Sequence, residues 1–317
     1  MINPAAAGFF LRAAFIGVWT ITMGPLHTQI HLQGMNSNNA EIAEANRHIE
    51  RLDRLARKHT RSFGGQSVCW RLFGSGPPVV LLHGGSGNWL HWVRNIEMLA
   101  TRFSVWVPDL PGFGESGTEA PADLAALLDA TVCTLDDLIG ANTVVNLIGF
   151  SFGGLVAAHL AGHRPNIKRL ALLGPVGHGG PRRMHDEMRS WQKAPNDAAL
   201  RELMQHNLAT LMLHEPASID ALALQVHTEA CRLTGFRSKE ISRAGGLADI
   251  LKQYQGSMLL LWGEHDVTAD PPQMARSLSA GHTNCQTQII ADAGHWVQFE
   301  RADAVNKLLL NWLIDMH

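Results

Sequence analysis

The stretch Gly149-Phe150-Ser151-Phe152-Gly153-Gly154 decides the fold of this chain. It follows an apolar run over residues 143–148, partly β-branched, which predicts a buried strand. It precedes residues 155–161, which are good helix formers without a breaker. Strand, G-x-S-x-G and helix in this order are typical of a nucleophile elbow, a sharp turn that lifts a serine hydroxyl above the edge of a sheet. We therefore predict that Ser151 is a nucleophile facing the free N–H groups of a helix N-terminus.

Short apolar runs alternate with helical patterns along the chain on either side of this stretch, from Ser67 to the end. Strands alternating with helices indicate an α/β fold, in which a mostly parallel, twisted sheet is covered by helices on both faces. The pattern predicts further strands at 68–73 (as an edge strand), 78–82, 103–107, 167–173, 258–262 and 287–290, and helices at 124–139 and 302–316.

The interval between the strands at 167–173 and 258–262 is much too long for a simple crossover. It contains apolar residues at helical spacing, and the predicted helices are 184–193, 197–213, 218–232 and 245–255. Ligands of open α/β sheets bind at the carboxyl ends of the strands. We therefore predict a helical cap over residues 177–246, inserted after the sixth strand between two core segments at 67–176 and 247–317.

Residues 1–34 form an apolar N-terminal extension that is interrupted by Arg12. The extension lacks the positive n-region and the cleavage site of a secretory signal, and it barely reaches the length of a membrane span. We expect an amphipathic lid segment or an upstream extension with Met35 as the natural start, rather than an anchor or export signal. Residues 35–66 are then a lead-in with a charged surface helix over 36–62, and a cytoplasmic location is favoured over an exported or membrane-anchored one.

The composition excludes several classes of function. The 317 residues are 46% hydrophobic and 17% charged, which is typical of a globular enzyme, and the net charge of −2 gives no reason to expect a nucleic-acid partner. The four cysteines are far apart with no C-x-x-C pair, which argues against a zinc ribbon or disulfide framework and suits a reducing compartment. Although the chain has 17 histidines, H-E-x-x-H is absent. We predict neither a metal nor a cofactor.

A serine hydroxyl becomes a useful nucleophile only when a base takes its proton and an acid orients that base. After a nucleophile elbow, the acid and the histidine follow the serine in the chain. Asp266 comes directly after the strand at 258–262, and His295 comes after the strand at 287–290. We predict these two residues as the acid and the base of a triad with Ser151. The rival acids are Glu264, Asp270 and Asp292.

The charge that develops on an attacked carbonyl oxygen needs fixed N–H donors. The backbone of Phe152, directly after the nucleophile, is one candidate, and Gly85 in the loop 83–87 is the other. A phosphate cradle is not favoured in this loop, because G-x-x-x-x-G-K-[ST] is absent. The predicted lining of the substrate pocket consists of Ser86, Trp89, Phe113, Phe150 and Trp296.

With these pieces in place, the chain resembles the α/β-hydrolase superfamily from about Ser67 to its end. The matching segments are the His83 loop, 109–116, the elbow, 262–266 and 294–295. The resemblance implies an α/β-hydrolase fold, Ser151, Asp266 and His295 as triad, and a hydrolase without a cofactor.

Some segments are also similar to the meta-cleavage-product hydrolases, which cut a carbon–carbon bond. These are 173–181 and 294–300, whereas Phe150 stands where that subfamily usually has asparagine. A cap arginine for the substrate carboxylate would be Arg182, Arg183 or Arg189.

We therefore favour a serine hydrolase that acts through an acyl-enzyme on a small, fairly apolar carboxylic ester. C–C bond hydrolysis is the alternative. A non-catalytic small-ligand binder on the same fold is the alternative of another class, and peroxide-dependent perhydrolase or haloperoxidase activity is a further one. The expected partner is a small-molecule substrate, and a homodimer is left open.

Overall fold

The structure is a computed structural model that describes the backbone of residues 25–183 and 186–314, and the side chains from residue 39 within those ranges. The chain divides into two compact units, Met1–Glu41 and Ile42–His317, and the helix α1 (Pro25–Leu55) runs from one into the other. The expectations for residues 1–24 lie outside the described residues. Among the helices that are described, none has the length and apolar character needed to cross a membrane.

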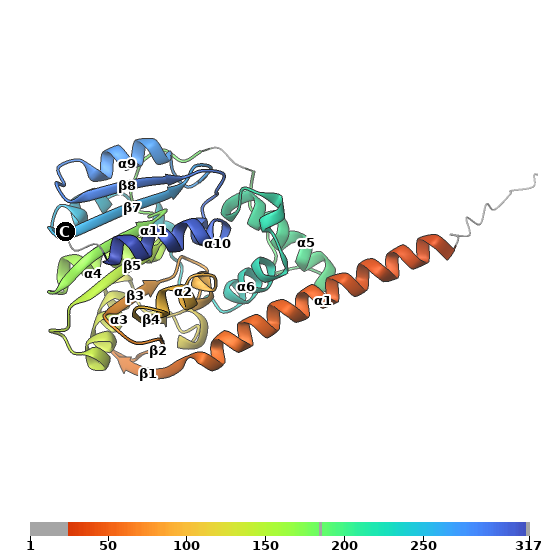
Figure 1. Ribbon diagram of the computed structural model, residues 1–317, viewed down its shortest axis with the longest axis horizontal. Coiled ribbons are helices and arrows are strands. Elements are labelled where there is room, and N and C mark those ends of the chain that lie inside the picture. Colours follow the sequence, from red (N-terminus) through yellow and green to blue (C-terminus); the bar gives the residue numbers. More distant parts are fainter. Residues whose placement is uncertain (1–24, 184–185, 315–317) are drawn as a thin grey trace, which may run out of the picture. The chain divides into compact units, whose positions relative to one another are not determined.

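The described residues form an eight-stranded sheet in the order β1-β2-β4-β3-β5-β6-β7-β8 (Figure 1). The pairs β1–β2 and β2–β4 are antiparallel, and all other pairs are parallel. This arrangement confirms the predicted mostly parallel sheet of an α/β fold. The strands are β1 (Arg57–Phe63), β2 (Gln66–Phe73), β3 (Pro78–Leu82), β4 (Ser104–Asp109), β5 (Val145–Phe150), β6 (Ile167–Leu173), β7 (Ser257–Gly263) and β8 (Cys285–Ile290).

The hairpin of β1 and β2 corrects two predictions. The predicted helix over 36–62 was wrong at its end, because α1 stops at Leu55 and β1 begins at Arg57. Gly64 and Gly65 both have positive φ, at 58° and 80°, which suits a two-residue hairpin turn. The second correction concerns β2, which is not an edge strand: β1, rich in polar and basic residues, covers it and forms the exposed edge.

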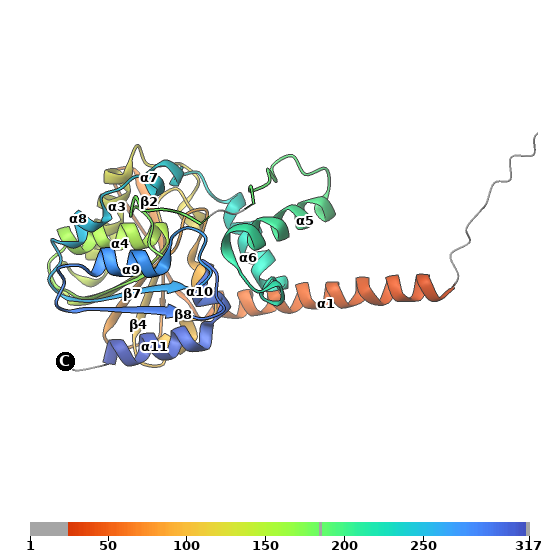
Figure 2. The ribbon, with the colours of Figure 1, turned by 90° about the horizontal axis from the view of Figure 1, so that it is seen from above.

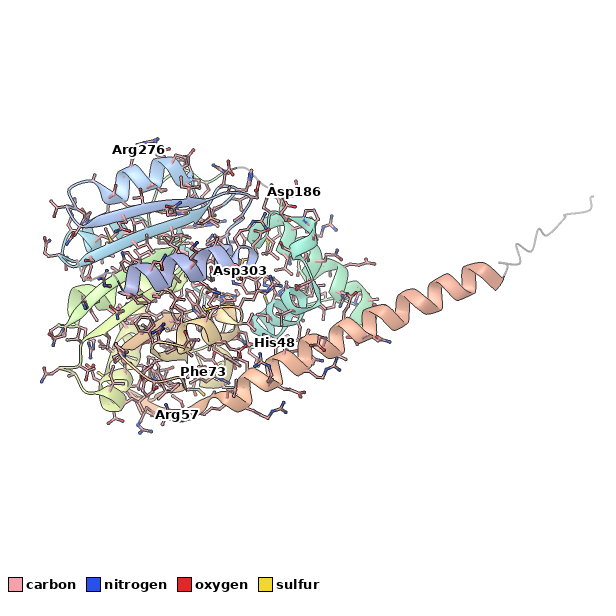
Figure 3. All side chains as sticks on the ribbon, viewed as in Figure 1. His48, Arg57, Phe73, Asp186, Arg276 and Asp303 are labelled. Atoms are coloured by element: carbon pink, nitrogen blue, oxygen red, sulfur yellow. The ribbon has the colours of Figure 1, made fainter. Side chains whose placement is uncertain are left out.

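Helices cover both faces of the sheet, as predicted (Figure 2). One apolar cluster joins the sheet to α3 (Leu124–Ile139), α4 (Phe152–His163), α8 (Leu247–Leu251) and α9 (Pro271–Ser279). A second cluster joins the other face to the end of α1, α2 (Ile96–Ala100) and α11 (Ala302–Ile314). Helix α9 shows the amphipathic pattern behind this layering: Met274 and Leu278 are buried, whereas Arg276 is exposed (Figure 3).

The segment between β6 and β7 is largely helical. The predicted helix over 184–193 is absent from its described part, 186–193, because the side chains of 186–190 are exposed and a short helix without a buried face gains no stability from packing. The helical elements of the segment, besides α8, are α5 (Asp197–Asn207), the π-helical turn η3 (Leu208–Met212), η4 (Pro216–Ser218), α6 (Ala221–Arg232) and α7 (Lys239–Arg243). Outside it lie η1 (Trp89–Trp92), η2 (Gly114–Ser116) and α10 (Val297–Glu300).

Candidate active site

The turn between β5 and α4 is as tight as the G-x-S-x-G pattern requires. Ser151 has φ +53°, a conformation that non-glycine residues rarely adopt. A Cβ atom added to Gly149 would lie 2.2 Å from the carbonyl oxygen of Gly153. A Cβ atom on Gly153 would lie 2.4 Å from the carbonyl oxygens of Leu82 and His83. Glycine on both sides of Ser151 therefore allows the helix to pack directly against the strands.

Replacing Gly153 by alanine is expected to lower the free energy of unfolding by about 3 kcal/mol, because the new methyl group meets backbone that cannot rotate away. Urea unfolding followed by circular dichroism measures the change. Gly162→Ala, in the same helix, is the matched control. A Cβ atom there would meet only Gln253 Oε1, at 3.4 Å, so this variant should gain about 0.5–1 kcal/mol. Equal stability of the two variants would contradict the close-packing argument.

The structure brings Ser151, His295 and Asp266 together, although they come from three different strand ends. His295 Nε2 lies 2.9 Å from Ser151 Oγ, and His295 Nδ1 lies 2.8 Å from Asp266 Oδ2. The imidazole and the carboxylate are both buried, while Ser151 is half-buried. The continuous hydrogen-bonded chain from carboxylate to hydroxyl is the arrangement that activates a serine.

Asp266 is held as a carboxylate. Burial by itself raises the pKa of Asp266, but the charge of His295 and hydrogen bonds from His295 and Thr268 outweigh burial and lower this pKa below its usual value. The Thr268 backbone N–H and hydroxyl both donate to Asp266 Oδ1, at 2.8 and 2.7 Å. Sequence reasoning missed Thr268, although a threonine two residues after an aspartate is a common local hydrogen-bonding pattern.

The rival acids have other places in the structure. Asp270 caps α9 by accepting a hydrogen bond from the backbone N–H of Gln273. Glu264 and Asp292 are exposed. Asp266 alone of the four is hydrogen-bonded to His295 among the described residues.

The two residues predicted to supply oxyanion-hole N–H groups, Phe152 and Gly85, lie close to each other next to the elbow, and their role stays a prediction. Phe152 is the first residue of α4, so its N–H has no partner within the helix. A Cβ atom on Gly84 would lie 3.2 Å from Ser151 Cβ, and one on Gly85 would lie 3.7 Å from Phe152 Cβ. Residues 83–87, the glycine loop, therefore pack closely against Ser151 and Phe152.

The predicted pocket residues fall into two groups. Ser86 is exposed in the glycine loop, with φ +49°. The ring of Phe150 lies 5.0 Å from that of His295, and Trp296 donates from Nε1 to the carbonyl oxygen of His91 at 3.0 Å. Phe150 directly precedes Ser151 and Trp296 directly follows His295, whereas Ser86 lies in the loop of residues 83–87.

Trp89 and Phe113, in contrast, make packing contacts. The ring of Trp89 lies 4.3 Å from the guanidinium carbon of the buried Arg71. Phe113 packs against Phe152 and Phe236, at centroid distances of 6.4 and 6.1 Å. Contact of all five pocket residues with a substrate stays a prediction.

Glu300 is a buried carboxylate that sequence reasoning did not single out. It accepts hydrogen bonds from the backbone N–H groups of His214 (2.9 Å), Glu215 (2.6 Å) and Gly294 (2.6 Å). Gly294 directly precedes His295, and residues 214–215 follow η3. Glu300 therefore ties the loop of the candidate base to the segment between β6 and β7.

We expect Glu300→Gln to lower the free energy of unfolding by about 3 kcal/mol. The amide is uncharged, so its hydrogen bonds are weaker than those of the carboxylate, and its NH2 group faces N–H donors to which it cannot bond. Urea unfolding measures this loss. Glu264→Gln, an exposed carboxylate in a neighbouring loop, is the control and should change stability by less than about 0.5 kcal/mol. A Glu300→Gln protein as stable as the parent would show that these bonds contribute little.

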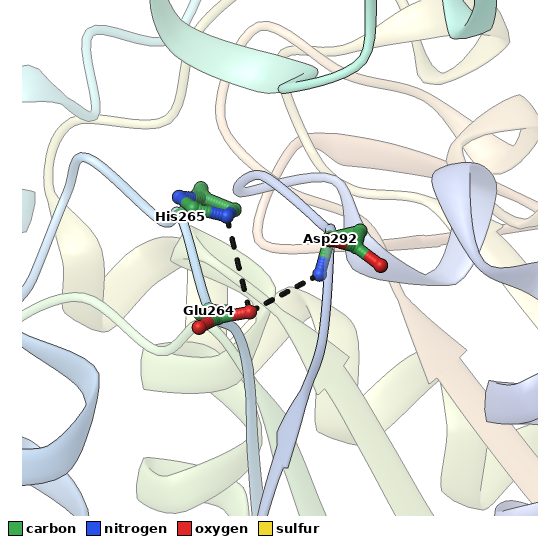
Figure 4. A group of neighbouring side chains, drawn as sticks. All are labelled: Glu264, His265 and Asp292. Carbon is green, nitrogen blue, oxygen red and sulfur yellow. Dashed lines mark hydrogen bonds and ion pairs between the residues drawn. The ribbon is translucent and has the colours of Figure 1, made fainter.

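Glu264, His265 and Asp292 are the described side chains whose composition and spacing would suit a metal ion (Figure 4). Their potential ligand atoms all lie within 4.8 Å of one another. Glu264 Oε2 accepts from the Asp292 backbone N–H at 3.3 Å, and the ring of His214 stacks on that of His265 at 3.6 Å. Exposed acidic groups commonly gather in this way without a metal, so the cluster does not by itself indicate one.

Fold and site together define the class of protein: an α/β hydrolase. A model of the alpha/beta hydrolase family matches residues 79–308, and the chain belongs to this family and is an enzyme of it.

Two relatives and one solved structure are similar to this chain. A 2-hydroxy-6-oxo-6-phenylhexa-2,4-dienoate hydrolase of Burkholderia cepacia is 28% identical, covering 76% of this chain and 88% of that protein. A pimeloyl-[acyl-carrier protein] methyl ester esterase of Vibrio campbellii is 41% identical over 30% of this chain and 35% of that protein. The crystal structure of a bacterial membrane phospholipase A superposes with a TM-score of 0.68 at 22% identity, covering 91% of this chain and 97% of that one.

Proposed function

We propose that this protein is a serine hydrolase that cleaves a small, fairly apolar carboxylic ester through an acyl-enzyme. The observation that carries the proposal is the unbroken chain of hydrogen bonds from Asp266 through His295 to Ser151, at 2.8 and 2.9 Å, at the N-terminus of α4. A half-buried serine in this setting has both a base for its proton and N–H donors for the charge of the transition state.

In the proposed reaction, Ser151 Oγ bonds to the ester carbonyl carbon while His295 Nε2 takes the hydroxyl proton. The N–H groups of Phe152 and Gly85 stabilise the oxyanion. Collapse of the tetrahedral intermediate breaks the C–O bond, and His295 returns the proton to the leaving alcohol. Water then attacks the acyl-enzyme by the same steps, which releases the carboxylic acid and restores Ser151. Asp266 holds the tautomer of His295 that has its proton on Nδ1.

The surroundings of Ser151 favour an ester over a C–C substrate that carries a carboxylate. Phe150 places an apolar ring, not an amide, next to the serine and 5.0 Å from the ring of His295. Of the arginines suggested for a carboxylate, Arg182 donates to the Ser242 carbonyl and Arg183 to the Glu264 carbonyl. Arg189 is exposed. The Burkholderia relative is named for a dienoate and the Vibrio relative for a methyl ester, so the comparison leaves both bond types within the family.

The proposal is tested with a fluorophosphonate probe, followed by short-chain esters and a vinylogous ketone assayed in parallel. We expect stoichiometric labelling of Ser151 and turnover of the esters. Labelling with turnover of the ketone only would replace the ester by a C–C substrate. A folded protein that neither labels nor turns over any substrate would overturn the hydrolase proposal and favour a binding protein on this fold.

A further inference from the structure

One ring nitrogen of His91, a residue of η1, is hydrogen-bonded to the glycine loop. Its Nδ1 accepts a hydrogen bond from the backbone N–H of Gly84 at 3.1 Å. Burial, and to a smaller extent His83, His227 and His295, lower the pKa of His91 well below the usual value, so the ring is neutral. A neutral imidazole that accepts through Nδ1 carries its hydrogen on Nε2. The Gly84 bond therefore fixes His91 as a donor through Nε2.

This donor lacks a partner. The side chain of His91 is 1% exposed, and Nε2 makes no hydrogen bond to any described residue. A buried donor left unpaired costs about 1–3 kcal/mol, so such a group in a native protein calls for an explanation.

The position of the ring suggests the explanation. The imidazole of His91 lies edge-on to Phe150, at a centroid distance of 5.4 Å, and 5.1 Å from Trp296. The ring of His295 lies 5.0 Å from the same Phe150. The unpaired N–H therefore belongs to a ring that is separated from the candidate base by a single aromatic side chain.

A second neutral imidazole approaches from the segment between β6 and β7. His227 of α6 is buried, and it acts electrostatically on His91. Burial lowers the pKa of His227 to about 4, and burial raises the pKa of the neighbouring Cys231 thiol to about 12, so both groups are neutral. Besides burial, the groups among the described residues that lower the pKa of His91 are histidines, and burial lowers the pKa of His227. This environment suits an uncharged ligand group and disfavours a carboxylate.

We propose that the Nε2–H of His91 donates a hydrogen bond to an uncharged oxygen of the substrate, a carbonyl or ether oxygen apart from the scissile group. The inference rests on the proposed function and narrows its substrate class to esters with such a second oxygen. His91 is then a specificity-determining residue: a site built to hydrogen-bond a substrate oxygen discriminates against the analogue that lacks it, because the buried donor stays unpaired.

The test compares matched esters by their kcat/KM. Butyl pentanoate is paired with its 4-oxopentanoate analogue, which places the oxygen in the acyl part, and with 2-methoxyethyl pentanoate, which places it in the alcohol part. His91→Asn keeps an acceptor for Gly84 but has no atom at the position of Nε2, whereas His91→Gln reaches that position with an N–H. The ratio of oxygenated to plain ester cancels any general loss of activity in a variant.

We expect His91→Asn to lower this ratio about 10-fold for one of the two pairs and His91→Gln to retain part of the preference. An unchanged ratio in His91→Asn for both pairs would overturn the inference and leave the proposed function intact. If the intact protein neither turns over the plain ester nor is labelled by the fluorophosphonate, both the inference and the proposed function are overturned.

Should the variants fail to fold, the intact protein still provides a test. Phosphonate adducts of Ser151 with and without the second oxygen are compared by ¹⁵N NMR of histidine-labelled protein. A shift of the His91 Nε2–H signal is expected only with the oxygenated adduct. Identical signals in both adducts would overturn the inference.

Discussion

Ser151→Ala is expected to reduce ester turnover by about 10⁴-fold or more and to abolish fluorophosphonate labelling. Removal of the hydroxyl leaves His295 Nε2, now 2.9 Å from Oγ, without a nucleophile to deprotonate. The residual rate would come from the N–H donors beside the site and from substrate binding. Single-turnover and steady-state kinetics of purified protein measure the loss.

The control for this variant is its thermal stability, which shows whether the fold is intact. Alanine keeps the Cβ of residue 151 in its φ +53° conformation, so thermal unfolding should match that of the parent. Full activity in a Ser151→Ala protein of unchanged stability would show that another group carries the reaction. Ser86→Ala, which removes an exposed hydroxyl from the glycine loop, should retain labelling and most of the turnover.

Asp266→Asn is expected to lower kcat by about 10⁴-fold while leaving KM within a few-fold. The amide preserves the shape of the carboxylate, but it neither stabilises an imidazolium nor selects the tautomer of His295 that leaves Nε2 free to take the serine proton. Asp270→Asn is the matched control, because its side chain caps α9 and asparagine caps helices equally well. Equal activity of both variants would remove Asp266 from the proposed mechanism.

Asp266→Asn is also expected to change how the free energy of unfolding depends on pH. Because the pKa of Asp266 is lower in the folded protein than in the unfolded chain, its carboxylate stabilises the fold above the unfolded pKa of about 3.9, and this contribution is lost as the pH falls through the folded pKa. The free energy of unfolding should therefore fall less steeply between pH 5 and pH 2 in Asp266→Asn than in the parent. Urea titrations across this range measure both slopes, and parallel slopes would contradict the lowered pKa.

Local sequence patterns were sufficient for the fold class and for the three residues that meet at the candidate site. A nucleophile elbow is specified by glycines two positions either side of Ser151, and the collision distances at Gly149 and Gly153 show why. Asp266 and His295 were found because each follows a predicted parallel strand, and the carboxyl ends of parallel strands meet at one edge of the sheet. The spacing of the glycines and the places of Asp266 and His295 after predicted strands therefore identify these residues without information about tertiary contacts.

The tertiary structure alone decided the features that depend on partners far along the chain. Residues 57–63 form a strand because Gly64 and Gly65 turn the chain so that β1 can pair with β2. The described residues 186–193 stay non-helical because the side chains of 186–190 are exposed, and the Arg189 backbone is hydrogen-bonded to the Asn207 side chain and not within a helix. The places of Glu300 and His91 follow from backbone N–H groups and rings that folding brings to them. Hydrogen bonds and burial of this kind leave no periodic trace in a sequence, since they arise only when distant segments meet.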